Sequence, residues 1–226
     1  MEEIRKRHNT IKRDIINRVC SNLKFPITVL DVGCGRGGDI PKWKDARVAK
    51  LYACDPDRAS VLEARSRNLK VYKWNASIFN GTIEQAPLKY FDIICYNFSL
   101  QYIFQTKFLF NKTIYEIAKR MKAGSYLIGV IPDAEKIIHL SPITYDGYVQ
   151  CSLREDDGRG NFGEKLYMYL KDTRYYENGP ISEPMAYKDV LVSTLYNFNI
   201  ELKEWNSMDG DGITKIYSTF IFVKTG

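Results

Sequence analysis

Several features that mark common protein classes are missing from this sequence. The 226 residues contain five cysteines without a CxxC pair and only two histidines, which argues against a disulfide framework and against a zinc site. The longest apolar runs, such as 126–131, fall far short of the roughly 20 residues that span a bilayer. The basic stretch 5–13 is followed by no signal-peptide apolar region. These absences predict an intracellular protein in a reducing compartment, neither secreted nor membrane-spanning.

Internal repeats, low-complexity segments and Pro/Gly/Ser linkers are missing as well. The composition, 45% hydrophobic and 27% charged, is that of a folded globular protein and excludes disorder and collagen-like fibres. Lys and Arg outnumber Asp and Glu by 33 to 27, and the formal charge of +6 favours an anionic partner such as a nucleotide or nucleic acid. We expect a single domain, 1–226, with an N-terminal helix in 1–24, a ligand-binding half in 25–131 and a sheet-completing half in 132–226.

Strand-like and helix-like segments alternate after the first helix. The apolar periodicity predicts a helix around 4–19, strands at 27–30, 51–54, 71–74, 91–96 and 125–131, and helices at 39–44, 56–67 and 108–121. Further strands are expected at 148–153, 165–170, 200–205 and 214–223, with a helix at 186–196. The alternation predicts an α/β fold whose mostly parallel sheet is covered on both faces. Part of the C-terminal half should complete the sheet with antiparallel strands, and part should form a substrate wall.

A glycine-rich turn, LDVGCGRGGD at residues 30–39, follows the first predicted strand and opens a helix. Glycines allow a tight turn and a close approach by a ligand. Asp55 follows Gly33 by 22 residues and ends the next predicted strand, where a carboxylate can accept ribose hydroxyl protons. Asp31 and Asp39 at the two ends of the loop would repel a pyrophosphate, so the pattern favours the cationic S-adenosylmethionine over NAD. An ordinary strand-to-helix turn remains the alternative.

Four stretches of the chain resemble the mRNA cap guanine-N7 methyltransferases. They are HNTIK at 8–12, LDVGCGRGGDIPKW at 30–43, NFSLQY at 97–102 and IY at 216–217, which together keep the family's motif order over almost the whole chain. The resemblance extends to the methyltransferase domain of large DNA virus capping enzymes of the African swine fever virus type. It implies a Rossmann-like, class I S-adenosylmethionine-dependent methyltransferase fold with a mostly parallel seven-stranded sheet.

The resemblance also implies a binding site for S-adenosylmethionine and no metal. Lys12 would reach the methionine carboxylate, Asp39 would lie near the methionine end, and Asp55 would bind the ribose. Asn97 stands where relatives usually have Gln near the sulfonium, and the Asn75 to Ser77 stretch stands where they have an adenine-binding Asp. The implied cofactor residues are Lys12, Gly33, Asp39, Asp55, Asn75, Ser77 and Asn97.

A cap-binding site is implied on the guanine side. Aromatic faces stack on a purine, and one carboxylate can accept both N1–H and the exocyclic amine of guanine. Gln101 departs from the family pattern, which commonly has His there. Arg36 and Arg67 match basic positions for the cap triphosphate, while Arg65 is an open candidate. The implied cap-binding residues are Asn9, Arg36, Arg67, Phe98, Gln101, Tyr102, Glu183 and Tyr217.

The activity implied is methyl transfer from S-adenosylmethionine to N7 of a GpppN cap by direct in-line displacement. Since N7 carries a lone pair and loses no proton, we expect no general base, and Glu183 would act by stabilising the developing cation. Expected partners are capped RNA and the triphosphatase and guanylyltransferase domains of a larger capping enzyme, in an intracellular setting that would be a host cytoplasm or a virion if the source is viral. Two alternatives stay open: a methyltransferase for another RNA or small-molecule acceptor, and a non-catalytic RNA-binding module with a degenerate cofactor site.

Overall fold

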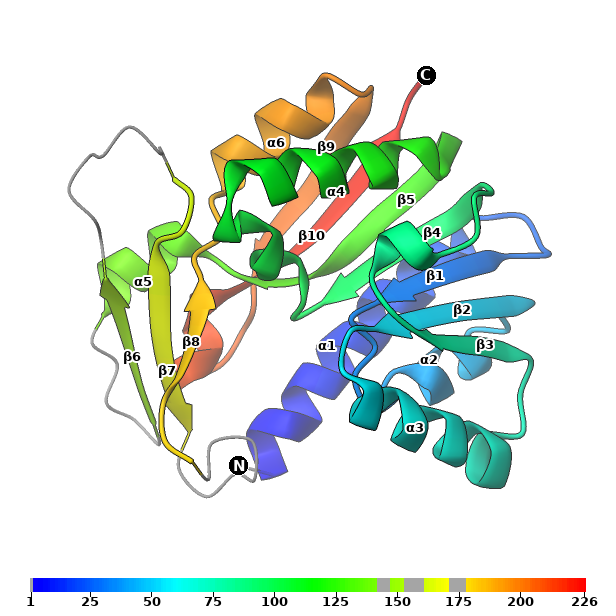
Figure 1. Cartoon of the computed structure of the whole chain (residues 1–226), viewed down its shortest axis with the longest axis horizontal. Helices are drawn as coiled ribbons and strands as arrows, with labels where there is room; N and C mark the ends of the chain where they lie inside the picture. Colours follow the sequence, from blue (N-terminus) through cyan, green and yellow to red (C-terminus); the bar gives the residue numbers. More distant parts are fainter. Residues whose placement is uncertain (1, 142–146, 153–160, 171–177) are drawn as a thin grey trace.

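The computed structural model describes residues 2–141, 147–152, 161–170 and 178–226. Its main sheet contains β1 (Thr28–Val32), β2 (Lys50–Asp55), β3 (Ala76–Asn80), β4 (Phe91–Asn97), β5 (Met121–Pro132), β9 (Ile200–Ser207) and β10 (Tyr217–Lys224). The strand order is β3-β2-β1-β4-β5-β10-β9 (Figure 1). The first five strands of the chain are parallel to one another, and β10 is antiparallel to both of its neighbours, β5 and β9. This confirms the predicted mostly parallel seven-stranded sheet.

Helices cover both faces of the sheet. They are α1 (Glu2–Ser21), α2 (Ile40–Asp45), α3 (Arg58–Arg67), α4 (Lys107–Lys119) and α6 (Lys188–Tyr196). Figure 1 shows α4 and α6 on one face and α1, α2 and α3 on the other. Alternate residues of β4 supply the two cores: Ile93 and Cys95 pack with the α1 side, and Ile94 and Tyr96 pack with the α4 side. The parallel strands therefore bring their carboxyl ends to one edge, where the loops that carry the motifs begin.

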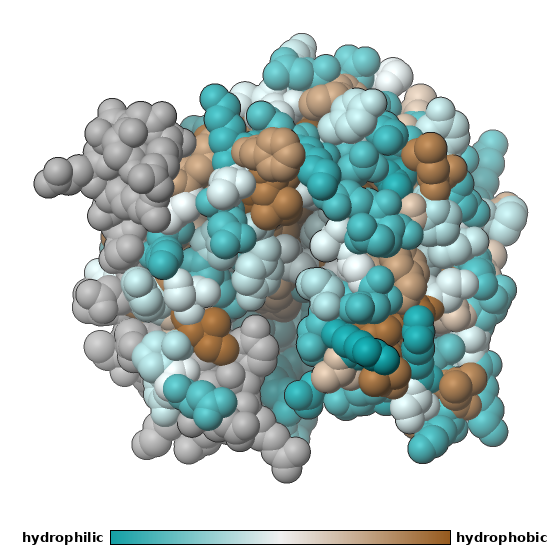
Figure 2. Space-filling view, in the orientation of Figure 1, coloured by the Kyte–Doolittle hydropathy of each residue, from teal (hydrophilic) through white to brown (hydrophobic). Residues whose placement is uncertain are grey.

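A second, three-stranded antiparallel sheet stands beside the main one. It consists of β6 (Gly147–Ser152), β7 (Lys165–Leu170) and β8 (Ile181–Pro184), in that order. A short helix, α5 (Ala134–Leu140), precedes it, and the sequence analysis predicted neither α5 nor β8. Leu153, the last residue of the predicted strand 148–153, lies outside the described residues. Figure 2 shows that the viewed face of the molecule is hollowed near its centre, between this small sheet and the α3 side.

The third predicted strand, 71–74, is wrong. Residues Asn68–Tyr72 form a π-helical turn, η1, that continues α3, and Lys73 then takes a left-handed conformation with φ of 46°. β3 starts only at Ala76. Helix α3 also begins later than the predicted residue 56, because Asp57 caps it by accepting hydrogen bonds from the amides of Ala59 and Ser60.

The end of the chain differs from the predicted strand 214–223 in a similar way. Residues Gly212–Ile216 form a 3₁₀ turn, η5, and β10 starts at Tyr217.

Among the helices within the described ranges, none is both long enough and apolar enough to cross a membrane.

Candidate active site

The glycine loop joins β1 to α2 in a conformation that only glycine adopts easily. Gly33 and Gly35 have φ of 76° and 50°. A Cβ on Gly33 would lie 2.3 Å from the Cβ of Ser99, so packing against the loop after β4 requires glycine there. The Ser99 hydroxyl donates to the carbonyl of Val32 at 2.7 Å. Gly33 thus fits the end of β4 against the loop and does not itself open space for a ligand.

Asp55 ends β2 beside this loop, as the sequence predicted. Its Oδ2 accepts a hydrogen bond from the Gly35 amide at 2.8 Å, and its Oδ1 accepts one from the Asp57 amide at 2.9 Å. Each carboxylate oxygen accepts more than one hydrogen bond, so Asp55 is held in place and keeps acceptor capacity for a pair of ribose hydroxyls. The donor set and the glycine turn therefore fit an adenosine ribose.

Asn75 and Ser77 do not join this site, which corrects the adenine-binding prediction. Asn75 accepts a hydrogen bond from Lys50 Nζ at 2.6 Å, and Lys50 begins β2 whereas Asp55 ends it. Ser77 pairs in register with Tyr52, midway along β2. The cause is the late start of β3. The polar residue at the carboxyl end of β3 is Asn80, which donates to the carbonyl of Asp55 at 3.0 Å.

Asp39 is the carboxylate on which the next group of polar side chains converges. It is only 8% exposed, and its Oδ1 accepts from Lys12 Nζ at 2.8 Å and from Lys42 Nζ at 2.7 Å. Its Oδ2 accepts from the Asn97 amide at 2.9 Å. Burial opposes ionisation of Asp39, but the two ammonium groups outweigh burial and hold its pKa below the ordinary value. Helix α1, the glycine loop and β4 therefore meet at one ionised carboxylate.

Asp31, expected at the mouth of the loop, is instead inside the sheet. It is 2% exposed, and its Oδ2 accepts from the indole Nε1 of Trp43 at 3.1 Å. Burial, followed by the charge of Asp39, raises the pKa of Asp31 to about 7. Of the two acids of the loop, only Asp39 is placed to meet a cationic ligand.

Phe98 and Tyr217 belong to an aromatic cluster after β4. Their ring centroids lie 5.0 Å apart with the planes nearly perpendicular. His8, from α1, stacks on Phe98 at 5.3 Å with an interplanar angle of 27°, and its Nε2 lies 3.3 Å from the hydroxyl oxygen of Thr214. Burial, followed by the charges of Lys12 and Arg7, lowers the pKa of His8 to about 4. The cluster is therefore aromatic, and its histidine is neutral near pH 7.

Phe98 holds a backbone conformation that non-glycine residues rarely adopt. Its φ is 60°, and its amide donates to the carbonyl of Val130 at 2.8 Å. Strain of this kind persists where the surrounding structure imposes it, and it gathers at functional sites. The Lys12 ammonium lies 5.7 Å from the Phe98 ring centroid, so one lysine borders both Asp39 and the aromatic cluster.

Glu183 lies on β8, only 5% exposed, with two predicted cap residues on its carboxylate. The Gln101 amide donates to Oε2 at 2.9 Å, and the Tyr102 hydroxyl donates to Oε1 at 3.0 Å. Both donors come from the 3₁₀ turn η3 (Leu100–Gln105). Burial raises the pKa of Glu183, and the two hydrogen bonds counteract the rise. A surface loop residue would show none of these contacts.

Asn97 and Phe98, adjacent in the chain, connect the two halves of the site. Asn97 binds Asp39 on the glycine-loop side, and the carbonyl of Phe98 accepts a hydrogen bond from the same Gln101 amide that binds Glu183. A ligand held at Asp39 and a flat ring held at Glu183 would thus be placed by consecutive residues at the end of β4.

Arg36 and Arg67 lie outside these clusters and share one carboxylate. Glu63 forms ion pairs with Arg36 at 3.3 Å and with Arg67 at 2.5 Å. Arg65 donates to the carbonyl of Ile78 at 2.8 Å, which places it on the β3 side of α3. Asn9 is exposed on α1, next to His8. The structure therefore brings Arg36 and Arg67 together and leaves Arg65 apart from them.

Two residues of the site, His8 and Lys42, were quoted in the motifs without a role. Lys42 is 3% exposed and also donates to the carbonyl of Gly38 at 3.0 Å. Its position three residues after Asp39 at a helix start was the available signal, because such side chains are neighbours on a helix. No sequence signal placed His8 on Phe98, which lies 90 residues away.

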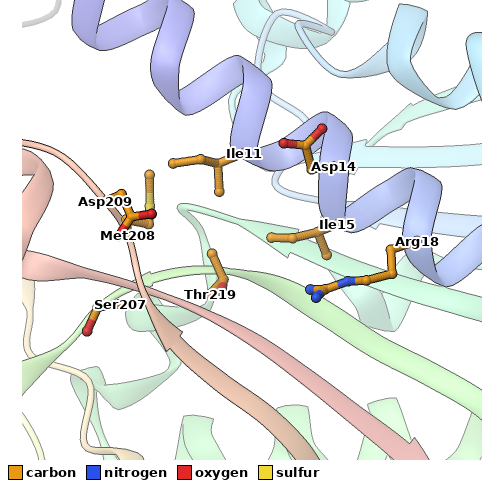
Figure 3. A pocket seen from close by; sticks show the side chains of 8 residues that line it. All are labelled: Ile11, Asp14, Ile15, Arg18, Ser207, Met208, Asp209 and Thr219. Atoms are coloured by element: carbon orange, nitrogen blue, oxygen red, sulfur yellow. The ribbon is translucent and has the colours of Figure 1, made fainter.

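Two hollows lie away from these residues. One, of about 250 Å³, separates α1 from the β9–β10 side and is lined by Ile11, Asp14, Ile15, Arg18, Ser207, Met208, Asp209 and Thr219 (Figure 3). The other, of about 560 Å³, adjoins α5 and η5. None of the predicted site residues lines either hollow. Within the described ranges, no group of three or more His, Cys, Asp or Glu side chains is placed to hold a metal ion.

Comparison with known folds agrees with this arrangement. An S-adenosylmethionine-dependent methyltransferase from Clostridium acetobutylicum superposes with a TM-score of 0.65 at 17% identity, over 96% of this chain and 89% of that one. The S-adenosylmethionine-bound amino pentose methyltransferase CalS10 from Micromonospora echinaspora gives 0.63 at 16% identity, over 97% of this chain and 92% of that one. At these identities the likeness shows a shared class I methyltransferase fold.

Sequence relatives identify the family within this methyltransferase fold. The mRNA cap guanine-N(7) methyltransferase of Candida glabrata is 27% identical over 78% of this chain and 43% of its own length. That of Saccharomyces cerevisiae is 30% identical over 60% of this chain and 33% of its own length. The chain thus spans less than half the length of these relatives. The family model for the mRNA (guanine-N(7))-methyltransferase domain matches residues 1–201. The chain therefore belongs to the mRNA (guanine-N(7))-methyltransferase family.

Proposed function

We propose that this chain transfers a methyl group from S-adenosylmethionine to N7 of the guanine in GpppN-capped RNA. The observation that carries the proposal is the link made by Asn97 and Phe98 between the Asp39 cluster and the Glu183 cluster. Methyl transfer needs its two reactants fixed at near-attack distance, and such placement can supply about 7–11 kcal/mol of the barrier. Consecutive residues that contact both clusters supply that placement.

The cofactor side fits S-adenosylmethionine by its donors and acceptors. Asp55 keeps acceptor capacity for two ribose hydroxyls, and the ionised Asp39 suits an ammonium group. Lys12, which contacts Asp39 from α1, suits the methionine carboxylate. When bound, S-adenosylmethionine supplies an electrophilic methyl group on a good leaving group.

The guanine side rests on Glu183 and the aromatic cluster. The partly exposed Phe98 ring, against which Tyr217 packs edge-on, offers a stacking surface worth roughly 1–3 kcal/mol to a base. The Glu183 carboxylate can accept from guanine N1–H and from the exocyclic amine, and it attracts the positive charge that forms on the base as N7 is methylated. Burial in a site of low dielectric strengthens that attraction. Glu183 is therefore the residue that we expect to contribute most to the chemical step.

The reaction calls for no general base. Guanine N7 has a free lone pair and loses no proton, so direct in-line displacement completes the transfer. His8, whose pKa lies near 4, is neutral near pH 7 and serves the cluster as a flat surface. Gln101, where relatives commonly have His, keeps a hydrogen-bonding role as a donor to Glu183.

The cellular setting is a further part of the proposal. We infer that the chain works inside the cell on capped RNA, together with triphosphatase and guanylyltransferase domains of a larger capping enzyme. A source of the large DNA virus type, as in African swine fever virus, is part of the same proposal and rests on the resemblance of the motifs alone. The intracellular setting and the capping partners rest on the family membership.

The test is an acceptor panel with methyl-labelled S-adenosylmethionine, accompanied by calorimetric titration of S-adenosylhomocysteine. The proposal expects tight binding of S-adenosylhomocysteine and label in GpppA and GpppA-capped RNA, with none in ApppA. Label in other acceptors alone would favour a different methyltransferase. Absent binding of S-adenosylhomocysteine would favour the non-catalytic RNA-binding module.

A further inference from the structure

The positive charge of the chain is concentrated in one segment. Residues 36–73 contain ten Lys and Arg against five Asp and Glu, whereas the other 188 residues contain 23 against 22. The segment therefore carries +5 of the net +6. Two of its five acids, Asp39 and Asp55, are committed to the site described above. Most of this positive charge faces solvent, because Arg36, Lys44, Arg58, Arg65, Lys70 and Lys73 are exposed.

Half of these basic residues lie on helix α3, on η1 and on the residue after it, a stretch that leads away from the site. Helix α3 starts directly after Asp57, two residues past Asp55, and runs to η1 (Figure 1). At 1.5 Å per residue the stretch 58–73 is about 24 Å long. Five of its residues, Arg58, Arg65, Arg67, Lys70 and Lys73, are basic, and Glu63 is its single acid. Glu63 is already shared by Arg36 and Arg67.

The far end of this stretch has cations without counter-charges. Among the described residues, no carboxylate lies within ion-pair distance of Lys70 or Lys73. Lys44, from α2, reaches the same end, where its Nζ donates to the carbonyl of Tyr72 at 2.8 Å. Leu69 and Val71 flank Lys70 and are 73% and 68% exposed. Cations beside exposed apolar side chains suit a strand that presents both phosphates and base or sugar faces.

We propose that α3 and η1 bind the RNA strand that follows the cap. The surface is continuous with Arg36 and Arg67, which share Glu63 and which the family resemblance implies for the cap triphosphate, and it leads outward from the site. RNA leaving the triphosphate would meet Lys70, Lys73 and Lys44 next. The inference rests on the proposed function for its starting point, but the surface itself binds phosphates whether or not methyl transfer occurs.

The test compares K70E/K73E with a control of equal charge change, K107E/K203E, whose residues lie on α4 and β9 at the opposite side of Figure 1. Binding of fluorescent GpppA-capped RNA of about 12 nucleotides is measured by anisotropy at salt concentrations from about 50 to about 200 mM. We expect K70E/K73E to weaken RNA binding at least tenfold and to reduce the salt slope by about 1.4, at about 0.7 for each lost phosphate contact. K107E/K203E should match the wild type.

The same variants are then assayed for methylation of the GpppA dinucleotide, which lacks the RNA strand that follows the cap. We expect K70E/K73E to keep wild-type kcat/KM on GpppA and to lose it on capped RNA. A second variant, R58E/K70E, repeats the test without altering the left-handed Lys73. Unchanged RNA affinity in both variants would overturn the inference. The basic surface would then be interpreted as a binding site for an acidic protein partner. If wild-type protein binds RNA through Lys70 yet methylates neither substrate, the proposed function fails and the RNA surface stands.

Discussion

The side-chain amide of Gln101 donates to Glu183 Oε2 at 2.9 Å and to the carbonyl of Phe98 at 3.1 Å. Because both partners of this nitrogen are acceptors, the orientation of the amide is fixed. With the Tyr102 hydroxyl on Oε1, Glu183 accepts from two donors; burial raises the pKa of Glu183, and these two hydrogen bonds limit the rise. Gln101, the departure from the family pattern, thus orients the carboxylate on which the proposal depends.

Replacing Glu183 by Gln tests that charge. The variant keeps the size of the side chain but loses the carboxylate, so both KM for the cap and kcat should worsen. A lost charged hydrogen bond of about 1.5–3 kcal/mol predicts a fall of about one to two orders of magnitude in kcat/KM. Single-turnover methylation at saturating cofactor measures it. Tyr102→Phe, which keeps the charge, should retain more of kcat. Wild-type kinetics in Glu183→Gln would remove Glu183 from the mechanism.

Asp55 and Asp57 provide a matched pair of neighbouring acids. Asp55→Ala removes the acceptors for the ribose and should lower the affinity for S-adenosylhomocysteine by at least tenfold while the fold remains. Asp57→Ala removes the cap of α3 and should lower stability with little change in that affinity. Calorimetry and thermal unfolding separate the two effects. Equal affinities in the two variants would contradict the assignment of Asp55.

Lys42 is expected to keep Asp39 in place so that Lys12 can serve the cofactor. Lys42→Met leaves a buried carboxylate with one ammonium fewer, which should lower the melting temperature and weaken S-adenosylhomocysteine binding by about tenfold. Lys44→Met, a change on the exposed side of the same helix, is the control and should leave that affinity unchanged. A Lys42→Met protein with wild-type affinity would show that Lys12 alone suffices.

Asp31 predicts a pH dependence of stability with a definite sign. Its pKa is raised by burial to about 7, whereas an unfolded Asp titrates near 4, so the folded protein binds this proton more tightly. Relative to Asp31→Asn, the wild type should lose stability as pH rises from about 4 to about 7, by at most about 4 kcal/mol, and then level off. Urea unfolding of both proteins at several pH values measures the difference. A wild type that gains stability relative to the variant over this range would contradict the placement of Asp31.

The sequence predicted the parts of this molecule that local chemistry determines. The glycine loop and the position of Asp55 could be predicted from the local sequence, because neighbouring residues determine tight turns and strand ends. The third strand failed for the opposite reason: Val71 and Tyr72 look like a strand, but η1 continues the helix before them and β3 starts at Ala76. Asn75 and Ser77 were then assigned to the wrong end of β3.

Long-range contacts explain the remaining differences. β8 contains only Ile-Ser-Glu-Pro, too short for a period of two, and it exists as a strand because it pairs with β7. The position of Glu183 opposite Gln101 and the stacking of His8 on Phe98 join segments 82 and 90 residues apart. No local pattern encodes such pairs, and only the resemblance to a family pointed to Glu183.

The most direct test of the account is the identity of the methylated atom. Wild-type protein is incubated with methyl-labelled S-adenosylmethionine and GpppA-capped RNA, the product is digested to nucleosides, and the labelled nucleoside is identified. The account predicts that the label is recovered as 7-methylguanosine from the cap, and that Glu183→Gln forms the same product more slowly. Label in the ribose of the first nucleotide, in an internal base, or in no nucleoside at all would contradict it.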